Sequence, residues 1–248
     1  MLKENIYFQK ILEIEIMIKI ENLIKIYNQV KVVDIGYLKI GKGEIVGLVG
    51  NNGAGKTTMI NLVLDLIKAN EGIVYSKDQD VSSFENWKNY TGSYIDENFL
   101  IGFLTSKEYF NFIASLHNVS KDELSRLLIE FKNFCDEDLL GSNKLIRDLS
   151  RGNKNKIGII ASLIGNPEIL ILDEPFANLD PTSQMWLRNK LISLKKFETT
   201  QLISSHDLKH ISEICSRILI INKGIIVNDI KANLDTLKEL DKYFDIRT

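Results

Sequence analysis

The segment GNNGAGKT at residues 50–57 constrains the fold of this chain more than any other, because it fits the spacing G-x-x-x-x-G-K-[ST]. It follows an apolar run at residues 44–49 and leads directly into a helix-like stretch. Glycines at these positions let successive backbone N–H groups converge on phosphate oxygens at a helix N-terminus. A glycine-rich turn with an incidental lysine is the alternative, but the strand before the loop and the helix after it favour a phosphate-binding loop.

This loop predicts a site for a nucleoside triphosphate together with Mg²⁺. Lys56 is expected to reach the β- and γ-phosphates, and Thr57 to supply a hydroxyl ligand for Mg²⁺. The positive end of the following helix adds to the attraction for phosphate. The residues expected to contact the nucleotide here are Asn51, Asn52, Gly53, Ala54, Gly55, Lys56, Thr57 and Thr58.

The composition indicates an ordinary globular protein. The 248 residues are 44% hydrophobic and 26% charged with a net charge of -2, so there is no overall basic field and no nucleic acid partner is expected. Cys135 and Cys215 stand far apart without metal-ligand spacing, which predicts reduced thiols and no disulfide. No apolar run reaches the ~18 to 20 residues that a membrane-spanning helix needs, and residues 1–16 lack a signal-peptide cleavage pattern.

Hydrophobic periodicity predicts an α/β fold with a mixed parallel sheet, an N-terminal antiparallel β-subdomain and an all-helical insertion at residues 105–164. A hairpin turn is expected at Asn28 and Gln29. Strands are expected at residues 18–27, 31–40, 44–49, 72–75, 168–172, 201–204 and 217–221. Helices are expected at residues 56–68, 106–113, 121–129, 182–196 and 233–243.

Two adjacent carboxylates, Asp173 and Glu174, follow the predicted strand at residues 168–172. Ligand sites in open parallel sheets lie at the carboxyl ends of strands, so this pair is expected beside the phosphate loop. We expect Asp173 to hold Mg²⁺ through its water shell and Glu174 to orient or deprotonate the water that attacks the γ-phosphate. Taken alone, such a pair is typical of a solvated turn, and only the phosphate loop upstream favours the catalytic interpretation.

The segment LSRGN at residues 149–153 stands shortly before this pair. With this order of motifs, almost the whole chain resembles the nucleotide-binding subunit of an ABC transporter, which has a P-loop NTPase core. The resemblance implies that Ser150 and Gly152 open a helix whose N-terminus caps the γ-phosphate of ATP held by the opposite subunit. By itself, a Ser-Arg-Gly turn that caps a helix explains the segment equally well.

His206 follows a predicted strand, as the switch-loop histidine of the family does. The resemblance implies that His206 contacts the γ-phosphate, and it completes an expected catalytic set with Glu174 and Lys56. His117 and His210 are assigned no such role, because a lone histidine is usually a surface residue or a hydrogen-bonded core residue.

Residues 177–181 resemble the loop that crosses the subunit interface in this family. A helix start, with Asp180 as the cap and Pro181 at the first helical position, explains the same segment, and both interpretations can hold together. Tyr27 is similar to the aromatic residue that stacks on the adenine ring, an interaction that contributes about 1–3 kcal/mol. A core role for Tyr27 is the alternative.

The sequence departs from the family pattern at three positions. Asp96 stands, beside Glu97, where most members have a glutamine that links the active site to the membrane partner. A carboxylate can bind Mg²⁺ or orient water but cannot donate a hydrogen bond when ionised, so Asp96 is a candidate metal ligand and coupling is expected to be tuned differently. Similar acidic replacements occur in exporters of antimicrobial peptides, in multidrug exporters and in ABC-2 type exporters. Arg151 replaces a usual glycine and Asn153 a usual glutamine, which leaves the helix-capping pattern intact.

The resemblance therefore implies an ATPase subunit that dimerises around ATP with a second copy or a homologous subunit. It would power an ABC transporter, an exporter, through separate integral membrane permease subunits, as a peripheral protein on the cytoplasmic face of the cell membrane. Residues 1–248 would form a single ABC ATPase domain. Within it, residues 17–95 and 166–248 would form the core with the β-subdomain, and residues from about 98 to 165 the helical signature subdomain.

Other functions share some of these motifs. A soluble ABC ATPase that drives assembly of another complex, such as iron–sulfur cluster machinery, has the same catalytic residues. Nucleic-acid- or ribosome-binding ABC proteins generally join two ATPase units or carry a long coiled-coil insertion, and the sequence has neither pattern. A small-molecule kinase shares the phosphate loop but does not account for the signature loop, the Asp-Glu pair and His206 together.

Overall fold

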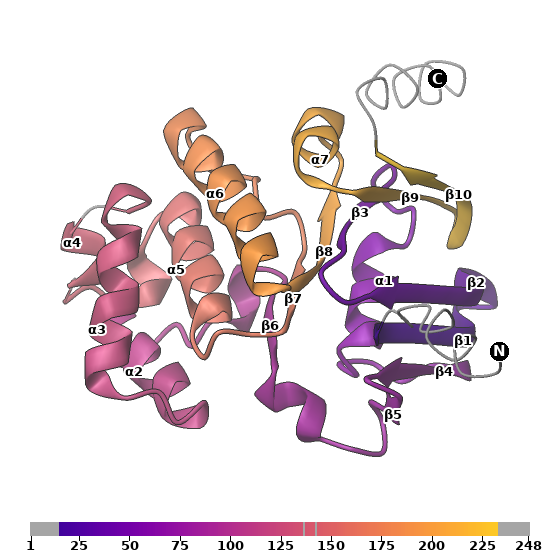
Figure 1. Cartoon of the computed structure of the whole chain (residues 1–248), viewed down its shortest axis with the longest axis horizontal. Helices are drawn as coiled ribbons and strands as arrows, with labels where there is room; N and C mark the ends of the chain where they lie inside the picture. Colours follow the sequence, from indigo (N-terminus) through magenta and orange to yellow (C-terminus); the bar gives the residue numbers. More distant parts are fainter. Residues whose placement is uncertain (1–14, 136, 142, 233–248) are drawn as a thin grey trace, which may run out of the picture.

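The computed structural model describes residues 15–135, 137–141 and 143–232 (Figure 1). Within these residues, a four-stranded sheet has the order β2-β1-β4-β5 and a six-stranded sheet has the order β10-β9-β3-β8-β7-β6. In Figure 1 the four-stranded sheet lies at one end of the molecule and the helices α2 to α5 at the other, with the six-stranded sheet between them. The α/β class, with an antiparallel N-terminal sheet and a helical insertion, is therefore confirmed.

The bounds of the elements follow. The strands are β1 (Ile16–Tyr27), β2 (Val30–Gly41), β3 (Ile45–Val49), β4 (Glu71–Ser76), β5 (Gln79–Asp80), β6 (Thr91–Tyr94), β7 (Ile169–Leu172), β8 (Thr200–Ser205), β9 (Arg217–Asn222) and β10 (Ile225–Lys231). The α-helices are α1 (Lys56–Val63), α2 (Ser106–Leu116), α3 (Lys121–Glu130), α4 (Glu137–Leu140), α5 (Arg151–Leu163), α6 (Pro181–Leu194) and α7 (Leu208–Ile214). Short 3-10 helices are η1 (Asn86–Asn89), η2 (Glu97–Phe99), η3 (Phe131–Asn133), η4 (Ile146–Asp148) and η5 (Lys195–Phe197).

The N-terminal hairpin turns at the two residues that the sequence predicts. Asn28 and Gln29 both have positive φ, of 48° and 66°, which is the backbone of a type I′ hairpin turn. Tyr27 pairs with Val30 across the turn, and β4 pairs with the other edge of β1, so the predicted strand at residues 72–75 does belong to the same layer.

The helix after the phosphate loop is shorter than predicted, because it ends at Val63 instead of continuing to residue 68. Asp65 adopts a left-handed φ of 49°. Leu66 N–H donates to Asn61 O and Asp65 N–H donates to Leu62 O, which is the pattern of a Schellman motif. These bonds satisfy carbonyls at the helix C-terminus and turn the chain towards β4.

The six-stranded sheet separates two hydrophobic cores. Along β3, Ile45 and Val49 join the core on the side of the helical insertion, whereas Val46 and Leu48 join the core shared with α1 and the N-terminal sheet. Burial on both faces explains why β3 reads as a continuous apolar run. The strands β3, β7, β8 and β9 are parallel as predicted, with Val49 opposite Ser205, and β6 joins them in parallel beside β7. Their carboxyl ends therefore meet at one edge.

Strand β6 was not predicted, because its four residues TGSY carry little strand signal. Tyr94 pairs with Leu172, which brings the segment that follows β6 to the same edge as Asp173. A side chain at Gly158 of α5 would overlap the Tyr94 ring, and one at Gly92 would overlap the Ser162 carbonyl. Close packing of α5 on β6 therefore accounts for this strand, which local propensity does not favour.

The helical insertion begins as predicted. Thr105 and Ser120 cap α2 and α3, each with a glutamate three residues later that completes a capping box. The core of the insertion contains Phe110, Phe131 and Phe134, which are fully buried. The predicted helix at residues 233–243 lies outside the described residues, and the proposed division into subdomains stays a prediction.

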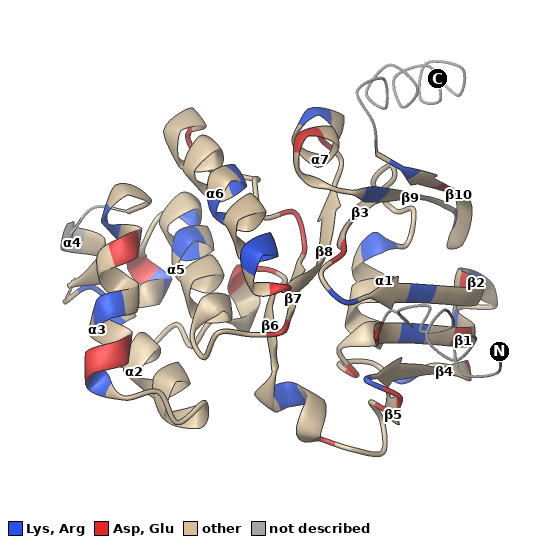
Figure 2. Ribbon diagram, in the orientation of Figure 1, with Lys and Arg blue, Asp and Glu red and all other residues tan. Residues whose placement is uncertain are grey.

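Charge and hydropathy add two observations. Basic and acidic residues are interspersed over both sheets and the helices (Figure 2), in line with the net charge of -2. In the part of the chain that the structure describes, no helix has the length and apolar character to span a bilayer.

Candidate nucleotide site

The phosphate loop connects β3 to α1 and depends on close backbone approach. A Cβ at Gly55, where φ is 107°, would lie 2.6 Å from Val32 O of β2. A Cβ at Gly50 would overlap the carbonyl of Ile221 in β9. These two positions therefore need glycine for packing as well as for loop shape, which explains two of the glycines in the motif.

A second hairpin turn supports the loop from outside. Gly224, between β9 and β10, donates its N–H to Ala54 O at 2.8 Å and accepts the Asp34 N–H at 2.8 Å. Its φ is 80°, and a Cβ there would lie 2.5 Å from Val32 O. Gly224 was not predicted as a site residue, although a glycine in a two-residue turn between two apolar runs is a hairpin signal.

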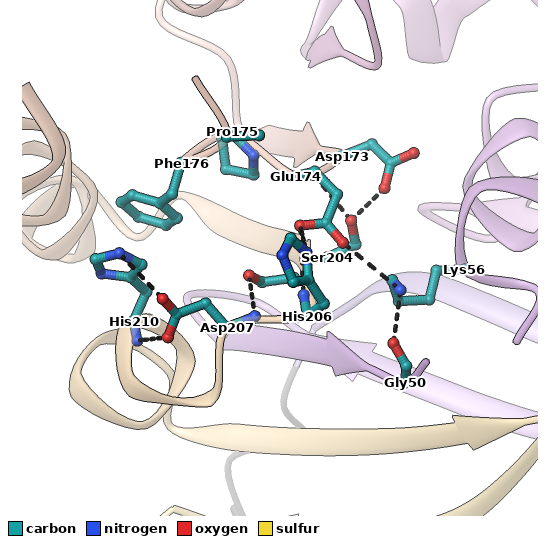
Figure 3. A network of polar contacts seen from close by, with 12 residues as sticks. Gly50, Lys56, Asp173, Glu174, Pro175, Phe176, Ser204, His206, Asp207 and His210 are labelled. Atoms are coloured by element: carbon teal, nitrogen blue, oxygen red, sulfur yellow. Dashed lines mark hydrogen bonds and ion pairs between the residues drawn. The ribbon is translucent and has the colours of Figure 1, made fainter. Parts of the chain in front are cut away.

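Lys56 is buried at the centre of the site, with 6% relative exposure. Its ammonium donates to Gly50 O at 2.7 Å and lies 3.5 Å from Glu174 Oε1. Glu174 Oε2 in turn lies 2.8 Å from His206 Nδ1. Figure 3 shows Lys56 and His206 on either side of the Glu174 carboxylate. The three residues predicted to be catalytic are thus brought into one polar network.

Asp173 stands beside this network and is held by two hydroxyl groups. Thr57 Oγ1 donates to Asp173 Oδ2 at 2.5 Å, and Ser204 Oγ donates to Asp173 Oδ1. Burial raises the pKa of Asp173, an effect that these two hydrogen bonds oppose. The Thr57 hydroxyl and the Asp173 carboxylate are oxygen donors of the kind that Mg²⁺ prefers, and a cation would offset the burial of the carboxylate, so these residues fit a magnesium ion.

Glu174 leaves strand β7 in a left-handed conformation with a φ of 47°. Its N–H donates to Ser204 Oγ at 2.9 Å, and the same hydroxyl donates to Asp173. One serine therefore fixes both adjacent residues and lets their carboxylates diverge. Ser204 was not predicted as a site residue; its place at the end of a buried strand is the signal that could have identified it.

A pocket of about 240 Å³ lies over the phosphate loop. Its lining includes Glu174, Val32 of β2 and the loop residues Asn52, Gly53, Ala54, Gly55, Lys56, Thr57 and Thr58. Tyr27 is 45% exposed, its ring lies under the Lys25 ammonium at 4.9 Å, and it is not among the lining residues. Its predicted contact with adenine stays a prediction.

A neighbouring pocket of about 260 Å³ is lined in part by the segment after β6. Asp96 and Glu97 line it together with Asp173 and Glu174. Asp96 also caps η2, since its carboxylate accepts the Asn98 N–H at 2.6 Å. Across the described ranges, no three His, Cys, Asp or Glu side chains gather closely enough to hold a metal by themselves. The predicted role of Asp96 as a metal ligand therefore remains an expectation.

The signature segment opens helix α5 as predicted. Ser150 Oγ accepts the Asn153 N–H at 3.3 Å, so it is the N-cap residue. A Cβ at Gly152 would lie 2.6 Å from Asn178 O, which shows how closely the helix start approaches the loop at residues 175–180. Neither Ser150 nor Gly152 lines the pocket over the phosphate loop of the same chain.

Buried Asn155 fixes α5 against this loop, because its Nδ2 donates to Pro175 O at 3.1 Å and to Ala177 O at 2.5 Å. Asp180 caps α6, Pro181 is its first residue, and Lys156 Nζ lies 3.2 Å from Asp180 Oδ2. The helix-start interpretation of residues 177–181 is therefore confirmed. Asn155 was not predicted, since nothing in the sequence distinguishes it from an exposed helical asparagine.

Arg151, one of the departures in the signature segment, has a side chain that is 78% exposed. Its Nε lies 3.5 Å from Glu97 Oε1, and Lys154 Nζ lies 3.4 Å from Glu97 Oε2. The first turn of α5 is thereby joined to the acidic segment after β6. The exposed Arg151 side chain is thus paired with a carboxylate.

Comparisons with known proteins agree with this geometry. The ABC transporter family model matches residues 34–177, more than half of the chain. An uncharacterized ABC transporter ATP-binding protein of Bacillus subtilis (strain 168), YhaQ, is 35% identical over 190 residues, which cover 75% of this chain and 62% of that protein. The ABC transporter ATP-binding protein NatA of the same strain is 30% identical over 212 residues, or 84% of this chain and 85% of NatA.

The fold agrees with a solved dimeric cassette of a bacterial ABC transporter, with a TM-score of 0.79 and 24% identity over 88% of this chain and 99% of the cassette. This chain spans less than two thirds of the length of YhaQ and most of the length of NatA. By its motifs, its fold and these matches, the chain belongs to the ABC transporter family of ATP-binding proteins.

Proposed function

We propose that the chain binds and hydrolyses ATP, dimerises around the nucleotide and powers an ABC exporter through separate integral membrane subunits. In this role it would act as a peripheral protein on the cytoplasmic face of the membrane. The observation that carries the proposal is the network in which Lys56, Glu174 and His206 meet at the edge of the parallel sheet.

The phosphate pocket supports ATP binding. Backbone groups of residues 52–58 line it at the start of α1, where N–H groups and the helix dipole favour an anion. The buried Lys56 ammonium stands within this lining, and a phosphate oxygen would compete with Gly50 O and Glu174 for its protons. Hydrogen bonds to charged groups contribute about 1.5–3 kcal/mol each, so Lys56 would supply a large share of the affinity.

The position of Glu174 supports hydrolysis. Its carboxylate lines both pockets, and His206 Nδ1 holds one of its oxygens at 2.8 Å. A carboxylate in this place can accept a proton from the water that attacks the γ-phosphate, while His206 and Lys56 stabilise the charge on the phosphoryl oxygens. Thr57 and Asp173 would hold Mg²⁺, which when bound neutralises charge on the β- and γ-phosphates.

The place of the signature segment supports a dimer. Ser150 and Gly152 start a helix whose N-terminus favours a phosphate, yet they do not line the phosphate pocket of their own chain. A second copy, or a homologous subunit arranged head to tail, would bring this helix start to the ATP held by the first. The dimeric cassette with the same fold fits this arrangement.

The acidic segment after β6 supports two parts of the proposal, the membrane partner and the role in export. Asp96 and Glu97 line the pocket beside Asp173 and Glu174, and Glu97 is joined to the first turn of α5. A partner that presses on this segment would therefore act on both the metal side of the site and the signature helix. The carboxylate of Asp96, in place of an amide, is the feature that favours an exporter.

Affinity purification of the Glu174→Gln variant with ATP, from detergent extracts of the native cell, tests the proposal. A stoichiometric integral membrane protein identified by mass spectrometry would support the transporter, and its sequence would indicate direction. Exclusively soluble partners would contradict the transporter and favour the assembly ATPase. A parallel purification from cells that make no tagged chain is the control for non-specific capture.

A further inference from the structure

His210, to which the sequence assigns no role, packs against the segment that carries Glu174. Its ring stacks on the ring of Phe176, with a centroid distance of 4.4 Å and an interplanar angle of 17°. Phe176 is 4% exposed, and the His210 side chain is 16% exposed. Figure 3 shows the two rings facing each other beside the Glu174–His206 pair.

This stack joins the same two segments as the polar contact of the site. Glu174 and Phe176 belong to the loop after β7, whereas His206 and His210 belong to the segment that runs from β8 into α7. The Glu174 carboxylate meets His206 Nδ1 at 2.8 Å, and two residues further along the loop Phe176 meets His210. The two contacts therefore tie the loop after β7 to the segment that leads into α7 at two points, and each restrains the other.

Asp207 completes this arrangement, because it fixes the start of α7. Its Oδ1 accepts the Lys209 and His210 N–H groups, its own N–H donates to Ser205 Oγ, and its Oδ2 lies 3.7 Å from His210 Nε2. The His210 ring is thus oriented by its own helix start as well as by Phe176. Glu174, by contrast, has a left-handed backbone with a φ of 47°, which needs support from its surroundings.

We propose that His210 is a positioning residue for ATP hydrolysis. Through its stack on Phe176 it fixes the position of the Glu174 carboxylate relative to His206. This inference rests on the proposed ATPase function. His210 touches no reacting atom, and its effect is on geometry. Since small misplacements of catalytic groups can cost up to about 100-fold in rate, loss of the stack is expected to lower kcat by about 10- to 100-fold.

The test compares four single variants of the full chain, and the double variant His210→Ala with Phe176→Leu, in ATPase assays over a range of ATP concentrations. His210→Ala removes the stack, His210→Phe keeps an aromatic ring there, and Phe176→Leu removes the other ring. His117→Ala is the matched control, because His117 is also a partly buried histidine and packs against Gly165, outside this network. Melting temperatures measured in parallel show whether a change in rate merely follows a loss of folded protein.

The inference predicts that His210→Ala lowers kcat about 10- to 100-fold with KM for ATP within about twofold, while His210→Phe restores most of kcat. It also predicts that the double variant with Phe176→Leu loses no more than the worse single variant, since the residues act as one unit. Unchanged kcat in His210→Ala, no recovery in His210→Phe, or additive losses would each overturn it. Wild-type chain that binds ATP without releasing phosphate would instead contradict the proposed function, and the inference with it.

Discussion

The Lys56 ammonium lies 3.5 Å from the Glu174 carboxylate. Lys56 follows β3 and Glu174 follows β7, two parallel strands whose carboxyl ends lie at one edge of the sheet. The same ammonium donates to Gly50 O, inside the phosphate loop. A γ-phosphate would therefore reach Lys56 in competition with the residue proposed to activate water. Lys56 therefore links nucleotide binding to the proposed hydrolysis step.

Replacement of Lys56 by alanine should weaken ATP binding about 10- to 100-fold, because a buried charged donor is lost from the phosphate pocket. Isothermal titration calorimetry measures the affinity directly. Lys68→Ala is the matched control, since Lys68 is exposed and lies beyond the end of α1. Equal affinities of Lys56→Ala and wild type would refute the assignment of the phosphate loop.

Replacement of Asp173 by asparagine should stabilise the nucleotide-free chain at pH 7. Burial raises the pKa of Asp173, so between its unfolded and folded pKa values the folded chain binds more protons than the unfolded chain. Stability is therefore lost as the pH rises through this window, and the loss persists at pH 7. Urea denaturation should show a higher free energy of unfolding for Asp173→Asn, with an advantage that shrinks as the pH falls towards 3.8.

A destabilised Asp173→Asn chain at pH 7 would show that the hydrogen bonds from Thr57 and Ser204 outweigh burial, contrary to this account. The same variant should lose most of its magnesium-dependent hydrolysis, since an amide is a poorer ligand for a hard cation than a carboxylate.

Replacement of Gly224 by alanine should destabilise the chain by more than about 1 kcal/mol and also weaken ATP binding. A Cβ there would lie 2.5 Å from Val32 O, on a backbone with a φ of 80°, and the Gly224 N–H holds Ala54 O of the phosphate loop. Gly36→Ala is the control, because a Cβ at Gly36 has no atom within 4 Å. Similar unfolding free energies and ATP affinities for the two variants would show that the turn does not support the loop.

Two substitutions at Asp96 separate its charge from its capping role. Asp96→Asn keeps an oxygen that can accept the Asn98 N–H, whereas Asp96→Ala removes it. If the charge of Asp96 couples the site to membrane subunits, both variants should reduce transport, or the stimulation of ATPase activity in the complex, more than they reduce basal ATPase activity of the isolated subunit. A loss in Asp96→Ala alone would assign the effect to capping. Equal losses in both assays would instead assign Asp96 a direct part in hydrolysis.

Local signals were sufficient to predict several parts of the fold. Asn28 and Gln29 tolerate positive φ and so identify the hairpin turn, and Asp180 followed by Pro181 identifies the start of α6. Strand β6 could not be predicted in this way, because it depends on the absence of a side chain at Gly158, which lies far away in the sequence. The end of α1 at Val63 was not predicted, because the left-handed position after the helix is occupied by Asp65 and not by the glycine that usually signals a helix C-terminus.

Within the candidate site, too, some residues could be predicted from local signals and others could not. Lys56, Thr57, Asp173, Glu174 and His206 belong to motifs with fixed spacing, and the fold brings their side chains together. No role was predicted for Ser204 or His210, because their partners Asp173 and Phe176 are more than 30 residues away in the sequence and are brought close by strand register. Long-range packing thus provides the residues that orient the site.

The most direct test of the account is the Glu174→Gln variant, which keeps the shape of the side chain but removes its ability to accept a proton. We expect phosphate release to fall at least about 100-fold while ATP affinity is retained, and an ATP-bound dimer to accumulate in size-exclusion chromatography. Phosphate release at the wild-type rate would remove Glu174 from its proposed role and contradict the mechanism.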